Sequence, residues 1–126
     1  MKRVIPISLM MVAMSTAWSA DTSAIIDTYQ SKTQQQFEAE KGAGLWAKAG
    51  KEGRTCGDCH GVNPTQPGKH VRTGKRIGPM AASVDAKRYR DQKKIEKWFK
   101  RNCKWTWGRE CTAVEKGHLL TWLVKQ

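Results

Sequence analysis

The chain has 126 residues, which suits one small domain and is too short for two independent hydrophobic cores. Its 23 lysines and arginines outnumber 11 acidic residues, for a formal net charge of +12. Such a charge could attract nucleic acid, an anionic membrane or an acidic protein, but no nucleic-acid motif is present and the basic residues are spread from Lys48 to Lys125. We therefore expect an acidic partner protein, with a merely solvated basic surface as the alternative.

The first residues follow the pattern of a secretory signal peptide. Lys2 and Arg3 precede an apolar run over residues 4–17, which ends in small residues around position 19. The run is too short to span a bilayer comfortably, and no stop-transfer segment follows, so stable membrane insertion is not expected. We predict a signal peptide over residues 1–19, cleaved after Ser19 or Ala20, and a single periplasmic domain over residues 20–126.

The apolar spacing predicts helices on both sides of a loop-rich centre. Residues 22–49 fit one long or two consecutive helices, with Gly42 and Gly44 as break points. Seven glycines and two prolines over residues 50–78 predict loop, except for one turn around the cysteines. The stretch from Asp21 to Glu40 resembles no family that we can place.

Two further helices are predicted in the C-terminal third. One begins at Asp91 and carries Trp98 and Phe99 to its end at Asn102. The other covers residues 112–125, with Thr112 as N-cap and a glutamate three residues later completing a capping box. Because no segment alternates as a strand does, the predicted class is all-α.

The sequence Cys56-Gly57-Asp58-Cys59-His60 is the attachment signature of c-type haem. Within a helical turn, thiols three residues apart reach the two vinyl groups of one porphyrin, and the next imidazole falls beneath the iron. We therefore predict one haem c, bound covalently through Cys56 and Cys59, with His60 as the proximal ligand. Zinc would need a second ligand pair, whereas Cys103 and Cys111 form no such motif, and a redox dithiol would need a βαβ context that is missing.

The sixth ligand decides whether the iron is closed for electron transfer or open to small molecules. Met80 is the usual type of distal ligand, but only twenty residues separate it from His60, and the Gly-Pro pair before it could instead place a carbonyl on the proximal imidazole. His70 is expected to be a surface residue, and His118 a partly exposed helix residue. Asn102 lies forty-two residues from His60, enough chain to pass around a haem, although it could equally be a helix C-cap.

Several segments together resemble the sphaeroides haem protein family. They are Arg72–Lys75, Gly78–Ala81, Lys97–Cys103, Gly108–Thr112 and Glu115–Gly117. The resemblance runs from about Gly42 to the C-terminus and implies a class I cytochrome c-like fold. It also implies His60 as proximal ligand, Asn102 as a labile distal ligand, and a Cys103–Cys111 disulfide. Such a bridge is expected in an oxidising compartment where the other two cysteines carry the haem.

The family's properties imply a function for this chain. In that family the asparagine detaches on reduction, the open ferrous iron binds oxygen or nitric oxide, and a dihaem cytochrome donates the electrons. The leading hypothesis is therefore a periplasmic monohaem cytochrome that accepts electrons and then binds a diatomic ligand. The alternative is a simple electron shuttle with stable Met80 or histidine ligation. The sequence offers no distal acid–base pair of the kind that a peroxidase uses. Whether the protein carries out other chemistry on oxygen or nitric oxide stays open.

Overall fold

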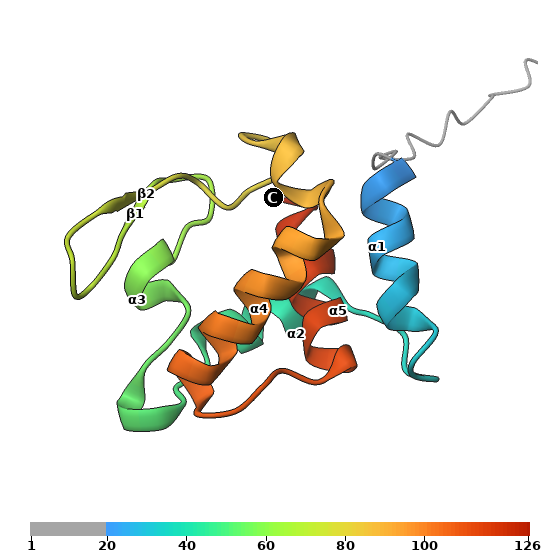
Figure 1. Ribbon diagram of the computed structural model, residues 1–126, viewed down its shortest axis with the longest axis horizontal. Coiled ribbons are helices and arrows are strands. Elements are labelled where there is room, and N and C mark those ends of the chain that lie inside the picture. Colours follow the sequence, from blue (N-terminus) through green and yellow to red (C-terminus); the bar gives the residue numbers. More distant parts are fainter. Residues whose placement is uncertain (1–19) are drawn as a thin grey trace, which may run out of the picture.

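The computed structural model describes residues 20–126 (Figure 1). The predicted signal peptide lies outside the described residues. The elements, in chain order, are α1 (Ala20–Gln30), α2 (Ala39–Ala47), the 3₁₀ turn η1 (Lys51–Gly53), α3 (Gly57–His60), β1 (Gly68–Lys69), β2 (Arg76–Ile77), the 3₁₀ turn η2 (Ala86–Tyr89), α4 (Gln92–Trp107) and α5 (Ala113–Leu123). The all-α prediction is confirmed. The described strands β1 and β2 have two residues each and pair antiparallel.

The N-terminal region forms two consecutive helices, one of the two predicted arrangements. The break falls over residues 31–38, however, and not at Gly42 or Gly44, which both lie inside α2. Gly42 has a different role, because a Cβ atom there would lie 2.2 Å from the carbonyl oxygen of His118 in α5. This glycine therefore lets α2 and α5 pack closely.

The starts of both C-terminal helices are confirmed. The carboxylate of Asp91 accepts a hydrogen bond from the Lys94 N–H at 3.0 Å and caps α4. At the start of α5, the Thr112 hydroxyl accepts from the Glu115 N–H at 3.2 Å, and the Glu115 carboxylate accepts from the Thr112 N–H at 2.9 Å. This reciprocal pair is the predicted capping box.

The predicted end of α4 at Asn102 is wrong. The helix continues to Trp107 and ends at Gly108, which adopts the left-handed conformation (φ 74°) that glycine tolerates best. Asn102 is therefore an interior helix residue, and a C-cap role for its side chain is excluded.

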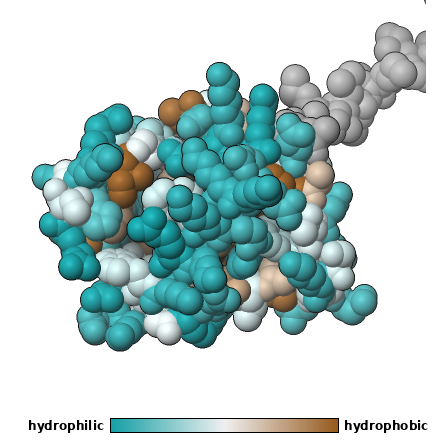
Figure 2. All heavy atoms as spheres, viewed as in Figure 1, coloured by the Kyte–Doolittle hydropathy of each residue, from teal (hydrophilic) through white to brown (hydrophobic). Residues whose placement is uncertain are grey.

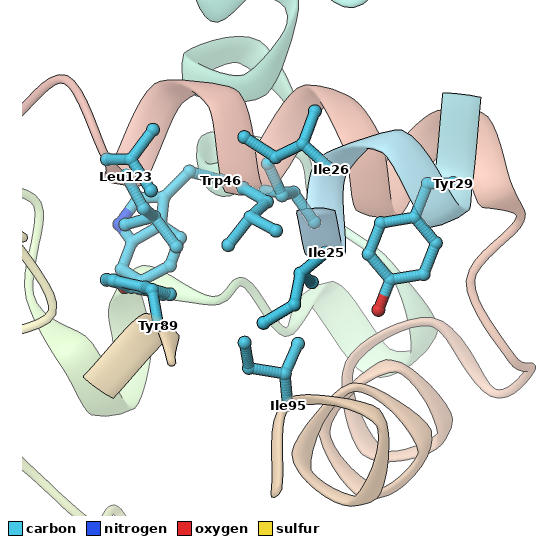
Figure 3. Packing of buried hydrophobic residues seen from close by; sticks show 10 residues of the cluster. Ile25, Ile26, Tyr29, Trp46, Tyr89, Ile95 and Leu123 are labelled. Atoms are coloured by element: carbon cyan, nitrogen blue, oxygen red, sulfur yellow. The ribbon is translucent and has the colours of Figure 1, made fainter. Parts of the chain in front are cut away.

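The core packs α1, α2 and α5 against the chain that leads into α4. They form one cluster, in which Trp46 of α2 and Leu123 of α5 lie at one end, Tyr29 of α1 lies at the other, and Ile25 and Ile26 lie between them (Figure 3). Tyr89 and Ile95 belong to the same cluster. Leu120 of α5 is fully buried. The face of the molecule seen in Figure 1 is mostly hydrophilic (Figure 2). No helix within residues 20–126 is long and apolar enough to cross a membrane.

Candidate functional site

One cavity brings together the residues of the attachment motif and of α4. Cys56, Cys59 and His60 line it from α3 and its N-cap, and Phe99 and Asn102 line it from α4. It holds about 730 Å³ of empty space, part of which is continuous with solvent. Except for a few polar groups, its walls are apolar and aromatic, as expected of a site for a large flat organic ligand.

The attachment motif forms a single helical turn. The N–H of His60 donates to the carbonyl of Cys56 at 3.2 Å, which closes the turn and places the two residues above one another. The Asp58 carboxylate accepts from the N–H of Thr55 at 2.8 Å and from its hydroxyl at 2.9 Å. The turn is therefore fixed by its own side chains, and its two thiols remain free to react.

The imidazole of His60 is positioned by packing. The ring centroids of Trp46 and His60 are 5.4 Å apart, and the Trp46 indole N–H donates to the Gly61 carbonyl at 2.9 Å. The buried Nδ1 of His60 has no hydrogen-bond partner among the described residues. The carbonyl contact predicted from the Gly-Pro pair is therefore not formed; the Gly78 carbonyl accepts from Arg88 instead, at 3.4 Å.

Burial keeps the Cys56 thiol and the His60 imidazole uncharged. Burial raises the pKa of the Cys56 thiol to about 11, which is the opposite of the shift expected for a reactive redox dithiol. Burial, aided by the Arg88 charge, lowers the pKa of His60 to about 4, so its imidazole is neutral and keeps a lone pair for a metal. No group of three metal-binding side chains occurs within residues 20–126.

Asn102 lies in an otherwise largely apolar face of α4. Ile95, Phe99 and Asn102 follow one another at spacings of four and three residues, and all three line the cavity. No hydrogen bond to the Asn102 side chain is formed within the described part of the chain. Because this side chain is only half-buried and lines the cavity, its amide is available to a ligand that enters there.

The C-terminal half of α4 is anchored on two sides. A disulfide joins Cys103 to Cys111, with the two Cα atoms 5.6 Å apart, as the family resemblance implied. On the other side, the Arg54 guanidinium lies 4.6 Å from the centroid of the Trp105 ring and donates to the Trp105 carbonyl at 3.2 Å. Because Arg54 lies only two residues before Cys56, this contact ties the attachment turn to α4.

The other proposed sixth ligands occupy different positions. Met80 lines the same cavity, and its carbonyl accepts a hydrogen bond from the hydroxyl of Tyr89. His118 is buried and not partly exposed as predicted; its Nδ1 accepts from the Glu38 N–H at 2.9 Å. The Nδ1 of His70 accepts two backbone N–H groups of the β1–β2 loop, at 3.2 and 3.3 Å. Neither histidine lines the cavity.

Comparison with known proteins identifies the family. Residues 32–123 match a family described as a domain of unknown function (DUF1924). Over 130 aligned residues, which cover all of both chains, the sequence is 34% identical to the cytochrome c-type protein SHP of Cereibacter sphaeroides. The chain belongs to the sphaeroides haem protein family. A second relative, cytochrome c'' of Methylophilus methylotrophus, is 37% identical over 62% of this chain and 54% of its own length.

Solved structures of both relatives share the fold. Oxidised SHP, described as an oxygen-binding cytochrome c, superposes with a TM-score of 0.78 over 83% of this chain and 96% of its own, at 37% identity. Oxidised cytochrome c'' gives 0.75 over 84% and 94%, at 26% identity. The fold is therefore that of class I c-type cytochromes, as the sequence predicted, and the protein is a monohaem c-type cytochrome with haem c as its cofactor.

The cavity fits this cofactor. Two free thiols three residues apart stand beside a neutral imidazole that has an unpartnered buried nitrogen, and the walls around them are aromatic and aliphatic. A haem of the c type uses both features, covalent anchors at one edge and a dry apolar surface on its faces. No sequence signal pointed to Trp46, which packs on the imidazole from a distant helix, because its contact depends on the tertiary fold.

Proposed function

We propose that Cys56 and Cys59 hold the haem, that His60 is its proximal ligand, and that Asn102 occupies the sixth position only in the oxidised protein. On reduction the Asn102 amide leaves, and a diatomic ligand such as oxygen or nitric oxide takes its place. The observation that carries this proposal is the unpartnered amide of Asn102 on the face of α4 that lines the cavity with His60.

The chemistry of the side chains supports a labile ligand. The bound haem supplies a one-electron redox change and one axial position for a small molecule. An amide oxygen is a hard, neutral donor that favours the ferric state, so reduction weakens its hold. His60, kept neutral by burial, remains a good ligand in both states. Its proximal role therefore does not depend on the change at Asn102.

The relatives supply two matching properties. SHP is described as an oxygen-binding cytochrome c, and the solution structure of cytochrome c'' bears on haem-ligand detachment in that protein. Among the described residues, no carboxylate, lysine or arginine lines the cavity, so it offers no acid–base pair for peroxidase chemistry. Both points favour binding of a diatomic molecule over its chemical conversion.

Location and electron supply complete the proposal. Residues 1–19 act as a signal peptide, and residues 20–126 form the single periplasmic cytochrome domain. A dihaem cytochrome c is the proposed electron donor. The disulfide fits an oxidising compartment, since such bridges persist there and are rare in the cytosol.

The competing function is electron transfer through a closed, Met80-ligated haem. It deserves a test because Met80 lines the same cavity. Absorption spectra of the holoprotein distinguish the two. Our proposal expects a five-coordinate high-spin ferrous spectrum that shifts with carbon monoxide, and a ferric spectrum that Asn102→Ala changes to that of an open or water-ligated haem.

The matched control is Met80→Leu, which alters the same cavity at nearly constant volume. It should leave the ferric ligand signature unchanged. A thioether-to-iron absorption band in the wild type that is lost in Met80→Leu and retained in Asn102→Ala would establish Met80 as the ligand and refute the proposal.

A further inference from the structure

The positive charge of this protein is concentrated in one segment. Within residues 69–104 there are thirteen basic and three acidic residues, for a net charge of +10. The rest of the described chain, residues 20–68 and 105–126, carries eight of each and is neutral overall. Basic residues do occur from Lys48 to Lys125, but only within residues 69–104 are they left unbalanced by acidic ones, so the net positive charge lies on the β1–β2 hairpin, η2 and α4.

Helix α4 bears a row of lysines on its outer face. Lys93, Lys97, Lys100 and Lys104 follow at spacings of four, three and four residues, so they share one side of the helix, and all four are exposed. The row is about 16 Å long at 1.5 Å per residue. Two of these lysines approach Glu110, at 3.8 and 3.7 Å, but exposed pairs of this length neutralise little. The face is one of high and largely unpaired positive charge.

Trp98 connects this outer face to the cavity. Its side chain lines the cavity and is also 46% exposed, which is unusual for so large an apolar group. Two cations flank its ring: the guanidinium carbon of Arg101 is 5.2 Å from the ring centroid, and Nζ of Lys97 is 5.9 Å away. An exposed aromatic within a basic rim is a common arrangement at the centre of protein interfaces.

We propose that the lysine row of α4, with Trp98 at its border, is the docking surface for an acidic electron-donor protein. The inference rests on the proposed electron-accepting function. The partner's carboxylates would face the lysine row, while Trp98 lies between the partner and the cavity. One electron then passes from the donor to the ferric haem, and no covalent bond forms or breaks.

The same charge could attract an anionic membrane, but the structure favours a protein. A membrane-binding helix pairs its basic residues with an apolar face that enters the lipid. The apolar face of α4 is instead occupied by the cavity and the core, with only Trp98 exposed. Charge complementarity at a lysine row near the redox centre suits a partner that arrives, transfers an electron and leaves.

The test measures reduction of the ferric holoprotein by fully reduced flavodoxin, a small acidic protein that gives up one electron from its flavin. The variant Lys93→Glu/Lys97→Glu reverses two charges of the row. The matched control Lys32→Glu/Lys125→Glu changes the net charge equally in the part of the chain that is neutral overall. Second-order rate constants are measured by stopped flow over a range of ionic strengths.

We expect the α4 variant to be slowed at least tenfold at low salt and to lose most of the salt dependence, since electrostatic steering raises association rates roughly 10- to 1000-fold. The control should change less than twofold. Equal slowing of both variants, or no slowing of either, would overturn the proposed surface. The proposal would also be overturned if the wild type cosedimented with phosphatidylglycerol vesicles at physiological salt and only the α4 variant failed to do so.

The proposed function is checked separately on the same samples. Dithionite reduces all three proteins without a docking step, and their ferrous and carbon-monoxide spectra report the sixth position. If all three proteins give open ferrous spectra and flavodoxin reduces them at the same rate, only the docking surface is refuted. A six-coordinate ferrous spectrum together with selective slowing refutes the labile ligand and leaves the docking surface standing.

Discussion

Gly68 lies where the β1–β2 hairpin crosses the haem-attachment turn, and replacing it by alanine should disturb both stability and the site. A Cβ atom at this position would lie 2.0 Å from the carbonyl oxygen of Cys59 and 2.7 Å from the Cα atom of His60. Ordinary contacts of a Cβ atom lie between 3.4 and 4 Å, so the backbones must separate by more than an ångström. Neither obstacle is a flexible side-chain end that could turn away.

The expected loss follows from this overlap. Overpacking costs about 1–3 kcal/mol when side chains can adjust, and here only the backbone can give way, so Gly68→Ala should lower the free energy of unfolding by about 3 kcal/mol or more. The assay is guanidinium denaturation of the ferric holoprotein followed by circular dichroism, with the haem absorption recorded in parallel. Because His60 would shift with its backbone, the absorption spectrum should change as well.

Gly44 provides the control. It lies in α2 with nothing within 4 Å of its Cβ position, so Gly44→Ala should stabilise the protein by about 0.5–1 kcal/mol through helix propensity. The reasoning fails if the free energy of unfolding of Gly68→Ala lies within about 1 kcal/mol of the wild-type value and its haem spectrum is unaltered.

Two further predictions concern the scaffold around the site. Burial, aided by Lys41, lowers the pKa of His118, whose Nδ1 already accepts the Glu38 N–H, so the folded imidazole resists a proton that the unfolded one takes. The free energy of unfolding should therefore fall as the pH drops below about 6.5, by up to about 1.4 kcal/mol per pH unit. Urea denaturation at a series of pH values should show a smaller fall in His118→Asn than in the wild type. Parallel plots of unfolding free energy against pH for the two proteins would contradict this. The disulfide joins two cysteines eight residues apart and so restricts the unfolded chain. Its removal in Cys103→Ala/Cys111→Ala should lower the free energy of unfolding by about 2–3 kcal/mol. An unchanged denaturation midpoint would contradict this argument.

The features predicted correctly from the sequence are those that nearby residues determine. The capping box of Thr112 and Glu115 and the cap of Asp91 involve residues three apart, and both are present as predicted. The single turn predicted around the two cysteines is equally local, and it forms over Gly57–His60. Such signals require no knowledge of what else the chain brings near.

The errors concern contacts between distant segments. Gly42 looks like a helix break in the sequence, yet it lies inside α2 because α5, some seventy residues later, packs against it. His118 looks like a helix-surface residue, yet the same packing buries it and gives its ring a partner at Glu38. Asn102 was predicted to end a helix because asparagine is common at helix C-caps. The helix instead continues to Trp107, and its last turn is held by packing and by the disulfide of Cys103.

The true length of α4 limits how Asn102 can leave its proposed position on the iron. The residue lies inside a regular helix, next to the disulfide-bonded Cys103. The following turn is held by Arg54, which donates to the Trp105 carbonyl and lies over the Trp105 ring. Moving the helix would break the disulfide geometry or this contact, whereas rotating the side chain breaks neither. Side-chain rotations are faster than backbone rearrangements by orders of magnitude. Release of the proposed ligand is therefore expected to be a local turn of one amide, on a helix that keeps its lysine row in place for the next encounter with a donor.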